Sequence, residues 1–359
     1  MAELASLPTP VVALDRLATH FGVAGEVYRK CDDRTAEAYG GNKVRTLEVL
    51  CGEALRLGAS HLYATGAYGS NHAAAACVHA PRVGLAPGVV LYPQPHSQAA
   101  AANLGIVLEA CPRERVRDLR HWSALPWGMF TERRRALGRG EAPYFMVPGG
   151  ATALGALGYV SGGLELALQV EARELPPPRR VVVATGSNCT TAGLLVGLVL
   201  AARLGIGFRG SAGAAPPRLV GVRVTPWPVT SVWRILELAH RASRLLAELA
   251  SDERLVVERR ELRAQLELDG SELGGGYGMA TASGREAVAL FDEHAGLELE
   301  TTYSGKSAAA LVKPLRGDAG GPILYWSTRT APPERRAIAL EAAAPRMRRW
   351  LRDATCEGQ

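Results

Sequence analysis

Apolar segments rich in β-branched residues alternate with helical segments along most of the chain. Five of them predict buried strands, at 61–67, 88–93, 179–186, 218–224 and 321–328. The segments between them have the apolar spacing of helices, at 72–80, 98–110, 191–204 and 230–250. Strands that alternate with helices are typical of α/β proteins, because parallel neighbours need a crossover connection. The sequence therefore predicts an α/β fold with mainly parallel sheets.

The size and charge of the chain narrow its class further. It has 359 residues, 47% of them hydrophobic, which is enough to build two domains. The net charge of +6 comes mainly from arginines spread along helical segments. Dispersed cations indicate solvated helix faces, and no basic run is interleaved with aromatic residues. We therefore expect no nucleic-acid partner.

The cysteines and the apolar segments bear on where the protein works. Its six cysteines form no CxxC pair and no metal-ligand spacing with its eight histidines. This pattern predicts a reduced cytoplasmic protein without a metal. The first residues lack the apolar core of a signal peptide, and no uninterrupted apolar run has the length of a membrane span. We expect no membrane partner.

Lysine is rare in this chain. Of its 41 Lys and Arg residues only four are Lys. Arginine keeps its charge, whereas lysine can lose its proton and form a Schiff base. Lys43 stands out because it follows a turn at Gly40 and Gly41 and precedes apolar residues at helical spacing. It is a candidate for a reactive amine, although a solvated lysine at a helix start fits the local pattern equally well.

Two segments place polar residues where a strand gives way to a helix. Ser70, Asn71 and His72 follow the first strand, and a second group follows the strand at 179–186. That second group consists of Gly186, Ser187, Asn188, Cys189 and Thr190. Free N–H groups at such a helix start suit a carboxylate or a phosphate. The glycine spacing matches neither a P-loop nor a dinucleotide motif, so the second segment predicts a monophosphate site. The alternatives are an ordinary N-cap and a turn without ligand.

Two tyrosines stand beside glycines late in the chain. Tyr277 lies between Gly276 and Gly278, and Tyr303 precedes Ser304 in the sequence YSGK. Glycine allows the backbone to approach a ligand closely, which makes both phenols candidate site residues. Taken singly, each is more typical of a packed core tyrosine.

Six motifs together resemble one family. They are DDRTAEAYGGNKVRTLE, GSNHA, VPGGATALGALGYV, GSNCTTAGL, GGYGMAT and YSGK. They look like the 1-aminocyclopropane-1-carboxylate deaminase and D-cysteine desulfhydrase family of pyridoxal-phosphate (PLP) enzymes. The resemblance covers about residues 8 to 330. It implies fold type II, like the tryptophan synthase β chain: two three-layer α/β/α domains with mainly parallel sheets and PLP between them.

The resemblance also implies roles for individual residues. Lys43 would hold PLP covalently and move the α-proton of the substrate. Asn71 would bind the phenolic oxygen of PLP, and Ser70 and His72 would bind the substrate carboxylate. The segment 186–190 would hold the phosphate. Two further roles concern the end of the chain: Tyr277 and Tyr303 would face the substrate, and Ser304 would lie against the pyridine nitrogen.

Four positions depart from the deaminases of this family. Ser304 stands where they have Glu, and His72 stands where they have Gln. A carboxylate would keep the pyridine nitrogen protonated, whereas a hydroxyl favours a neutral ring and a weaker electron sink. Opening a cyclopropane needs the stronger sink, so Ser304 argues against that substrate. Thr46 replaces a lysine near the phosphate, and 326–330 replaces a loop that ends in glycine.

We therefore expect a lyase that removes an α-proton and expels a β-leaving group, most simply from D-cysteine, to give pyruvate, ammonia and sulfide. The alternatives are a 1-aminocyclopropane-1-carboxylate deaminase, a β-replacement synthase and a non-catalytic ligand-binding relative. The expected domains are a large PLP-binding domain at 1–48 and 166–345, a smaller inserted domain at 49–165 and a tail at 346–359. A homodimer is expected, as is common in the family.

Overall fold

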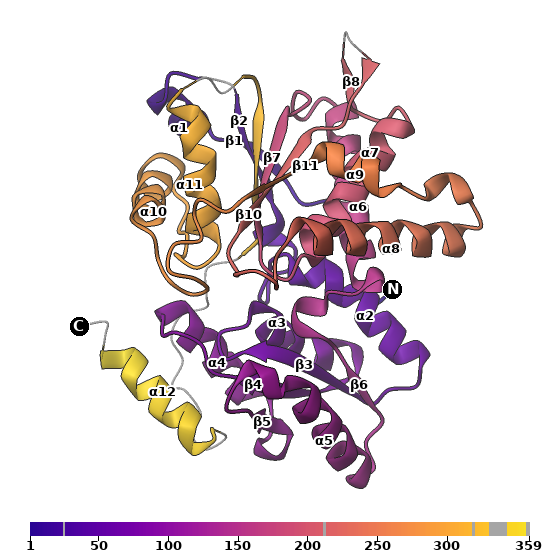
Figure 1. Cartoon of the computed structure of the whole chain (residues 1–359), viewed down its shortest axis with the longest axis vertical. Coiled ribbons are helices and arrows are strands. Elements are labelled where there is room, and N and C mark those ends of the chain that lie inside the picture. The colour runs from indigo at the N-terminus through magenta and orange to yellow at the C-terminus, as the bar shows by residue number, and fades with distance from the viewer. Residues whose placement is uncertain (24–25, 211–212, 318–319, 330–342, 357–359) are drawn as a thin grey trace. The chain divides into compact units, whose positions relative to one another are not determined.

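The computed structural model describes residues 1–23, 26–210, 213–317, 320–329 and 343–356 (Figure 1). The chain forms two compact units. Unit 1 contains Met1–Ala5, Ala36–Gly150 and Pro332–Gln359, and unit 2 contains Ser6–Thr35 and Ala151–Ala331. Both units are built on sheets with helices packed against them.

Unit 2 is built on a six-stranded sheet. In spatial order its strands are β1 (Val11–Ala13), β2 (Val27–Cys31), β12 (Ile323–Ser327), β7 (Arg180–Thr185), β10 (Arg218–Arg223) and β11 (Leu266–Asp269). Only β1 runs antiparallel to its neighbour among these pairs. The carboxyl ends of the parallel strands therefore share one edge, which is where ligands bind in such sheets.

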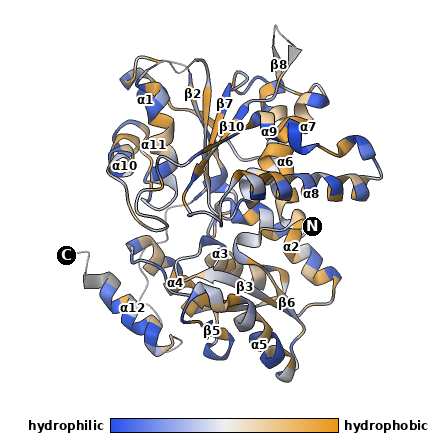
Figure 2. Cartoon of the chain, in the orientation of Figure 1, coloured by the Kyte–Doolittle hydropathy of each residue, from blue (hydrophilic) through white to orange (hydrophobic). Residues whose placement is uncertain are grey.

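Helices cover both faces of this sheet (Figure 1). One face carries α6 (Ala153–Glu171), α7 (Cys189–Arg203), α8 (Val232–Ala250) and α9 (Arg259–Gln265). The other carries α1 (Asp15–His20), α10 (Ala282–Ala295) and α11 (Ser304–Leu315). Successive residues of a strand point to opposite faces, so Val181 and Val183 join the core under α6 and α7, while Val182 joins the core under α11. Figure 2 shows hydrophobic colouring in the centre of this sheet, whereas β2 and β11 also contain charged residues.

Helices α6 and α7 pack with their backbones in contact. A Cβ atom built on Gly193 would lie 2.2 Å from the Ala156 carbonyl oxygen, and one on Gly197 would lie 2.3 Å from the Val160 carbonyl oxygen. Gly163 faces Gly197 in the same way. No side chain larger than a hydrogen fits at these positions, because the neighbouring atoms are backbone. The contact fixes where α7 begins.

Helix α6 is the one described helix that is long and apolar enough to cross a membrane. Glu165 and Gln169 interrupt its apolar sequence, so α6 does not contradict the prediction that no uninterrupted apolar run has this length. Within the structure 61% of its apolar window is buried, and α6 packs against α7 and α8. These contacts are those of a core helix.

Unit 1 is built on a four-stranded parallel sheet. In spatial order its strands are β5 (Val116–Asp118), β4 (Ala86–Tyr92), β3 (His61–Ala67) and β6 (Pro143–Phe145). Its helices are α2 (Lys43–Arg56), α3 (Asn71–His79), α4 (Gln98–Ala110), α5 (Leu125–Gly138) and α12 (Pro345–Cys356). Helix α3 contacts β3, whereas α5 contacts β4 and β6 from the other face (Figure 1).

The remaining elements are short. Among the described residues they are the two-stranded sheet of β8 (Arg209–Gly210) and β9 (Gly213–Ala214) and six 3₁₀ turns. The turns are η1 (Asp32–Arg34), η2 (Ala80–Val83), η3 (Arg113–Arg115), η4 (Trp122–Ala124), η5 (Pro148–Gly150) and η6 (Glu253–Leu255).

The five predicted strands and four predicted helices are all present, as β3, β4, β7, β10 and β12 and as α3, α4, α7 and α8. The predicted tail at 346–359 is wrong, because α12 occupies Pro345–Cys356; residues 357–359 lie outside the described part. Met347, Trp350 and Leu351 are buried on one side of α12. The compact units also differ from the expected domain limits at 48 and 165, and the division into domains stays a prediction.

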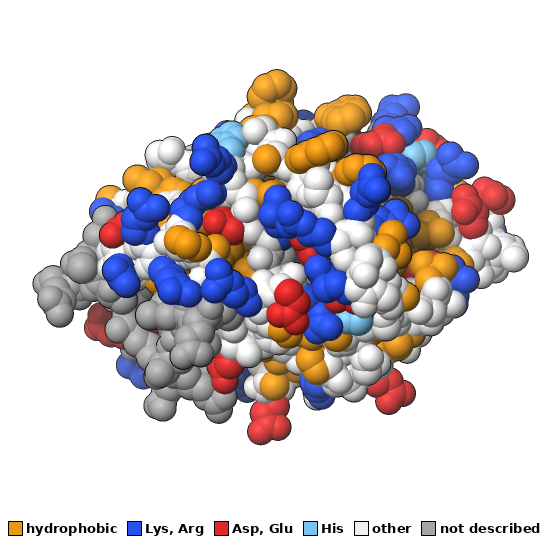
Figure 3. All heavy atoms as spheres, turned by 90° about the horizontal axis from the view of Figure 1, so that it is seen from below, with side chains coloured by type: hydrophobic (Ala, Val, Ile, Leu, Met, Phe, Trp, Pro, Cys, Tyr) orange, Lys and Arg blue, Asp and Glu red, His pale blue; other side chains and the backbone are white. Residues whose placement is uncertain are grey.

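Arginines are spread over the surface of the protein. On the face drawn in Figure 3, basic side chains are interspersed with acidic and hydrophobic ones. Several form surface ion pairs, such as Arg203 with Glu261 and Arg259 with Glu237. This distribution is that of solvated helix faces, as the sequence indicated. The expected absence of a nucleic-acid partner stays a prediction.

Candidate active site

Lys43 is the first residue of α2. The chain reaches it through Gly41, whose φ of 128° is open to glycine alone without strain. Its Nζ donates a hydrogen bond to the carbonyl oxygen of Gly149 at 3.3 Å. Gly149 and Gly150 both have positive φ, at 69° and 67°, and form the turn η5. The half-buried amine is thus held at the start of a helix by a glycine turn far away in sequence.

The turn at η5 also approaches α3. A Cβ atom on Gly150 would lie 2.7 Å from Thr46 Cγ2 and 3.2 Å from His72 Cε1. The first turn of α2, the glycine turn and the first turn of α3 therefore pack against one another. Lys43 and His72, which the sequence predicted as site residues, lie in one cluster of unit 1.

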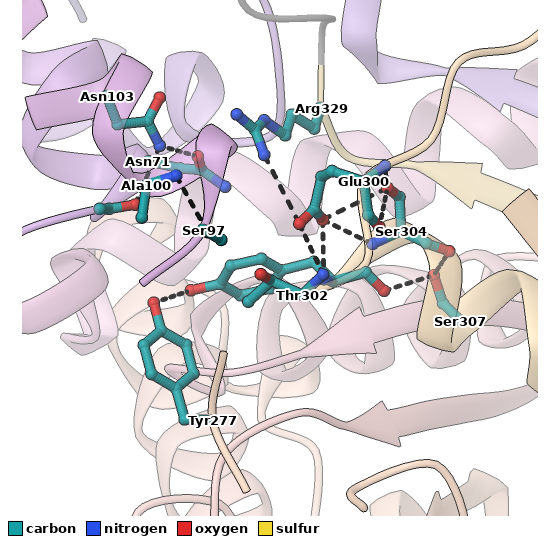
Figure 4. Close-up of polar contacts among 12 residues, drawn as sticks. Asn71, Ser97, Ala100, Asn103, Tyr277, Glu300, Thr302, Ser304, Ser307 and Arg329 are labelled. Carbon is teal, nitrogen blue, oxygen red and sulfur yellow. Dashed lines mark hydrogen bonds and ion pairs between the residues drawn. The ribbon is translucent and has the colours of Figure 1, made fainter. Parts of the chain in front are cut away.

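The start of α3 presents the predicted polar residues in different ways. Ser70 is the N-cap, and its Oγ accepts a hydrogen bond from Ala73 N at 3.3 Å. The Asn71 Oδ1 atom accepts one from Asn103 Nδ2 at 2.6 Å and lies 3.3 Å from Tyr39 OH (Figure 4). Asn103 Nδ2 also donates to the Gly69 carbonyl oxygen at 2.9 Å. Because the Asn71 oxygen is held, its Nδ2 group is the part turned toward other acceptors.

His72 is a buried histidine, with 1% of its surface exposed. Neither ring nitrogen has a hydrogen-bond partner among the described residues. Burial, and to a smaller extent the charge of Lys43, lowers the pKa of His72 to about 3. The ring is therefore neutral near pH 7, with one nitrogen able to donate and one able to accept.

This pKa predicts an acid-sensitive fold. In the unfolded chain the pKa of a histidine is about 6.5, so below that pH the unfolded state binds a proton that folded His72 refuses. The free energy of unfolding should fall by up to roughly 1.4 kcal/mol per pH unit as the pH drops from 6.5. Urea unfolding at pH 7 and pH 5 should show that the free energy of unfolding falls less in His72→Gln than in the wild-type protein. The exposed His121 gives the control variant His121→Gln, and an identical loss in all three proteins would contradict the prediction.

In unit 2 the predicted phosphate segment follows β7 and leads into α7. Asn188 is the N-cap of α7 and has a left-handed φ of 71°. Its side-chain Nδ2 donates a hydrogen bond to the Val229 carbonyl oxygen at 2.9 Å. Its Oδ1 is buried without a hydrogen-bond partner among the described residues. Thr225 Oγ1 donates to the Gly186 carbonyl oxygen at 3.0 Å. The Gly186 carbonyl group is thus held by Thr225, and the N–H groups that follow it lie at a helix start.

Tyr277 and Tyr303 form a pair in unit 2. Their hydroxyl oxygens are 2.7 Å apart, and their rings meet edge to face at an angle of 79° (Figure 4). A Cβ atom on Gly186 would lie 3.2 Å from Tyr303 Cε1. Three predicted site residues from different parts of the sequence therefore lie together at the carboxyl end of β7.

Ser304 begins α11, and its hydroxyl is engaged by Glu300. Ser304 Oγ accepts from Glu300 N at 2.8 Å and lies 3.1 Å from the Glu300 carbonyl oxygen (Figure 4). The Glu300 carboxylate accepts hydrogen bonds from the backbone N–H groups of Thr302, Tyr303 and Ser304, at 2.7, 2.7 and 2.9 Å. It therefore caps the helix start electrostatically. Arg329 Nη1 lies 3.6 Å from Glu300 Oε2.

The chain matches the family model described as "Pyridoxal-phosphate dependent enzyme" over residues 2–328. It belongs to this family of PLP-dependent enzymes. Among curated proteins, the D-cysteine desulfhydrases of Salmonella newport (strain SL254) and Salmonella enteritidis PT4 (strain P125109) are each 33% identical over 344 residues. Each of these matches covers 92% of this chain and 94% of the relative.

Solved structures agree with this assignment. A crystal structure of an ACC deaminase homologue has a TM-score of 0.72 and 29% identity, over 91% of each chain. A fungal L-serine ammonia-lyase from Rhizomucor miehei has a TM-score of 0.56 and 14% identity, over 90% of this chain and 94% of that one, which shows the shared fold. These similarities confirm the predicted family, fold type II, the PLP cofactor and the reaction class. The protein is a PLP-dependent lyase.

The residues present in this PLP-dependent enzyme fit the cofactor. Lys43 supplies an amine at the tip of a glycine turn, and Asn71 presents amide hydrogens because its oxygen is held. The segment after β7 supplies N–H groups at the start of a 15-residue helix. Gly186 leaves room beside Tyr303 that a side chain would fill. An amine for the aldehyde, an amide for the phenolic oxygen and N–H groups for the phosphate are the partners PLP needs.

A second lysine, Lys306, is near predicted site residues and is an alternative to Lys43 for binding the cofactor. Lys306 is buried, which lowers its pKa, but its Nζ donates to the carbonyl oxygens of Leu273 and Gly276, at 2.8 and 3.2 Å. It thereby ties the loop that carries Tyr277 to α11. Its hydrogen bonds give it a structural explanation.

Sequence reasoning missed four residues that support the predicted ones. Asn103 and Tyr39 hold Asn71, while Glu300 caps the start of α11 and Arg329 lies beside Glu300. Asn103 was visible as an amide inside the apolar run 99–108, and Glu300 as an acid four residues before Ser304. The partners of both could only be found in three dimensions.

Proposed function

We propose that this PLP-dependent lyase acts on D-cysteine or on a close relative with a sulfur or chloride leaving group. With D-cysteine, one water molecule would be consumed and pyruvate, ammonia and hydrogen sulfide would be formed. The match to D-cysteine desulfhydrases along 92% of this chain carries the proposal. The residue pattern at Ser304 and His72 supports it.

PLP, when bound, withdraws electrons from the substrate Cα and so acidifies its proton. The Lys43 amine is the group that we propose accepts this proton. Its position at a helix start, held by the Gly149 carbonyl oxygen, gives the amine a fixed origin and a short reach. The Asn71 amide, held by Asn103, would orient the ring of the cofactor.

The substrate carboxylate is assigned to the start of α3. Ser70 offers a hydroxyl, and the helix start offers N–H groups with a positive dipole. His72 would contribute as a neutral donor, because burial lowers its pKa to about 3. A neutral donor binds a carboxylate less tightly than a cation and so favours product release.

The tyrosine pair is assigned to the leaving group. When the Cβ–S bond breaks, its electron pair stays on sulfur, and a phenol of Tyr277 or Tyr303 would give the departing thiolate a proton. The 2.7 Å contact between their oxygens lets one hydroxyl stabilise the phenolate formed at the other. The proton removed from Cα would remain on Lys43 until it is lost to solvent.

Ser304 argues for a substrate whose β-group leaves readily. A hydroxyl cannot supply the full negative charge that holds a proton on the pyridine nitrogen. The nearby Glu300 carboxylate does not replace that charge, since three backbone N–H groups and Arg329 already surround it. A weak electron sink suits β-elimination better than cyclopropane opening.

A substrate screen tests the proposal. The purified protein would be given D-cysteine, L-cysteine, β-chloro-D-alanine and 1-aminocyclopropane-1-carboxylate, with pyruvate and sulfide measured. We expect pyruvate from D-cysteine and the chloro compound, and none from the cyclopropane. Turnover that needs a second nucleophilic substrate would indicate a β-replacement synthase. Bound PLP without any turnover would indicate a ligand-binding relative.

We also propose a cytoplasmic homodimer. Three aromatic side chains around the start of α5 are exposed, namely Trp122 at 61%, Trp127 at 68% and Phe130 at 51%. Aromatic residues of this size are enriched in the cores of protein interfaces. The oligomeric state can be measured by sedimentation, and Trp127→Glu should shift it toward the monomer.

A further inference from the structure

The guanidinium group of Arg329 is buried, and not all of its hydrogen-bond donors are used. Its side chain is 8% exposed, and its Nη2 is buried without a hydrogen-bond partner among the described residues. A buried guanidinium is costly unless its charge is paired and its N–H groups are bonded. The charge partner is present, but among the described residues no hydrogen-bond acceptor faces Nη2.

Glu300 does not satisfy this guanidinium. The distance of 3.6 Å from Arg329 Nη1 to Glu300 Oε2 exceeds that of a hydrogen bond. The Glu300 oxygens already accept backbone hydrogen bonds from Thr302, Tyr303 and Ser304. The pair therefore neutralises charge, while Nη2 remains a donor without an acceptor in the part of the chain that the structure describes.

The position of Arg329 in unit 2 connects it with the predicted phosphate segment. It follows β12, which pairs with β7 in the register Ile323↔Arg180 through Tyr325↔Val182. Arg329 lies two residues beyond the end of β12, and Gly186 directly follows the end of β7. Both residues then stand at the carboxyl edge of the sheet, where parallel sheets bind ligands. Tyr303 packs beside the same glycine.

We infer that Arg329 Nη2 donates to an oxyanion bound at the carboxyl edge of the unit 2 sheet. The oxyanion is either the phosphate of the cofactor or, in place of the assignment to α3 made above, the carboxylate of the amino-acid substrate. This inference rests on the proposed function, which supplies both anions. Arg329 would then be an anion-binding residue. A glycine at this position could not take this role, because it has no side-chain donor.

The variants are Arg329→Gln and, as the matched control, Arg316→Gln. Arg316 also pairs with a glutamate, Glu286, but both side chains are about half exposed. Because the single change leaves Glu300 buried without its partner, the double variant Arg329→Gln with Glu300→Gln removes both charges together. Circular dichroism and thermal melting show which variants fold.

Two measurements separate the two sources of the oxyanion. Rebinding of PLP and of pyridoxal, which has no phosphate, is followed by absorbance. Substrate binding is followed as KM for D-cysteine and as competition by D-alanine and by ethylamine, which has no carboxylate. A charge-assisted hydrogen bond corresponds to roughly a 10- to 100-fold change in affinity.

If the phosphate is the ligand, Arg329→Gln weakens PLP binding by about 10- to 100-fold and leaves pyridoxal unchanged. If the carboxylate is the ligand, PLP binding is unchanged, KM for D-cysteine rises by a similar factor, and only D-alanine loses affinity. The inference is overturned if Arg329→Gln behaves like Arg316→Gln, within twofold, in both measurements. If Arg329→Gln does not fold, the double variant takes its place in this comparison.

If the purified protein binds no PLP, the proposed function is wrong, but the oxyanion site can still be tested. Inorganic phosphate and acetate would then be added to wild type and Arg329→Gln in a thermal-shift assay. Stabilisation of wild type alone supports the oxyanion site. Equal stabilisation of both proteins, or of neither, rejects it.

Discussion

Replacing Lys43 by alanine should reduce pyruvate formation by at least about 10³-fold, because the variant loses both the covalent attachment of PLP and the base that takes the α-proton. The wild-type protein should absorb near ~410–430 nm through PLP bound to an amine, and Lys43→Ala should lose that band. Borohydride reduction followed by peptide mapping should place the label on the peptide that contains Lys43.

Lys313→Ala is the matched control for this experiment. Lys313 has a half-exposed side chain paired with Glu272, so its loss should leave the absorbance and the activity close to wild type. A label found on Lys306 would overturn the assignment of Lys43. The hydrogen bonds of Lys306 to Leu273 and Gly276 make that outcome unexpected, because its amine would have to leave both carbonyl groups.

Removing the hydroxyl of Tyr303 should lower kcat for D-cysteine by about 10²-fold or more, which is the usual effect of losing a general acid. Tyr277→Phe should have a similar effect, because its hydroxyl lies 2.7 Å from that of Tyr303. The double variant should be little worse than either single one, since two residues that act as a unit are not additive. Steady-state kinetics with D-cysteine gives the comparison.

A chemically better leaving group should reduce the difference in kcat between the wild-type protein and the tyrosine variants. Chloride needs no proton, so the tyrosine variants should lose less activity with β-chloro-D-alanine than with D-cysteine. The control is Tyr68→Phe, a buried tyrosine of unit 1 whose hydroxyl donates to Asp118 at 2.6 Å. Activity of Tyr303→Phe within twofold of wild type on D-cysteine would remove the tyrosine pair from the mechanism.

The architecture was accessible from the sequence because its signal is local. The β-branched run at Val181, Val182 and Val183 is buried on both faces of the sheet, so it appears as a continuous apolar segment. Glycine and polar residues after such a run mark the strand-to-helix turns that carry the candidate site. The terminal helix α12 was missed because its arginines hide the helical spacing of Met347, Trp350 and Leu351, which are buried.

The residues that support the candidate site were harder to predict from the sequence, because their roles depend on contacts between distant segments. Glu300 and Arg329 are 29 residues apart in number, and only the folding of β12 and the start of α11 in one unit makes them neighbours. Likewise, Asn103 reaches Asn71 only because α3 and α4 pack together. No local pattern encodes such pairs, since propensity and periodicity describe single elements.

The close packing of α6 and α7 bears on the entropy of cofactor binding. Gly193 and Gly197 press backbone against backbone, so α7 cannot slide or tilt without a steric clash. The segment 186–190 is anchored on one side by β7 and on the other by this helix. A loop clamped in this way has few conformations to lose when a phosphate arrives, so little of the binding free energy is spent on ordering it.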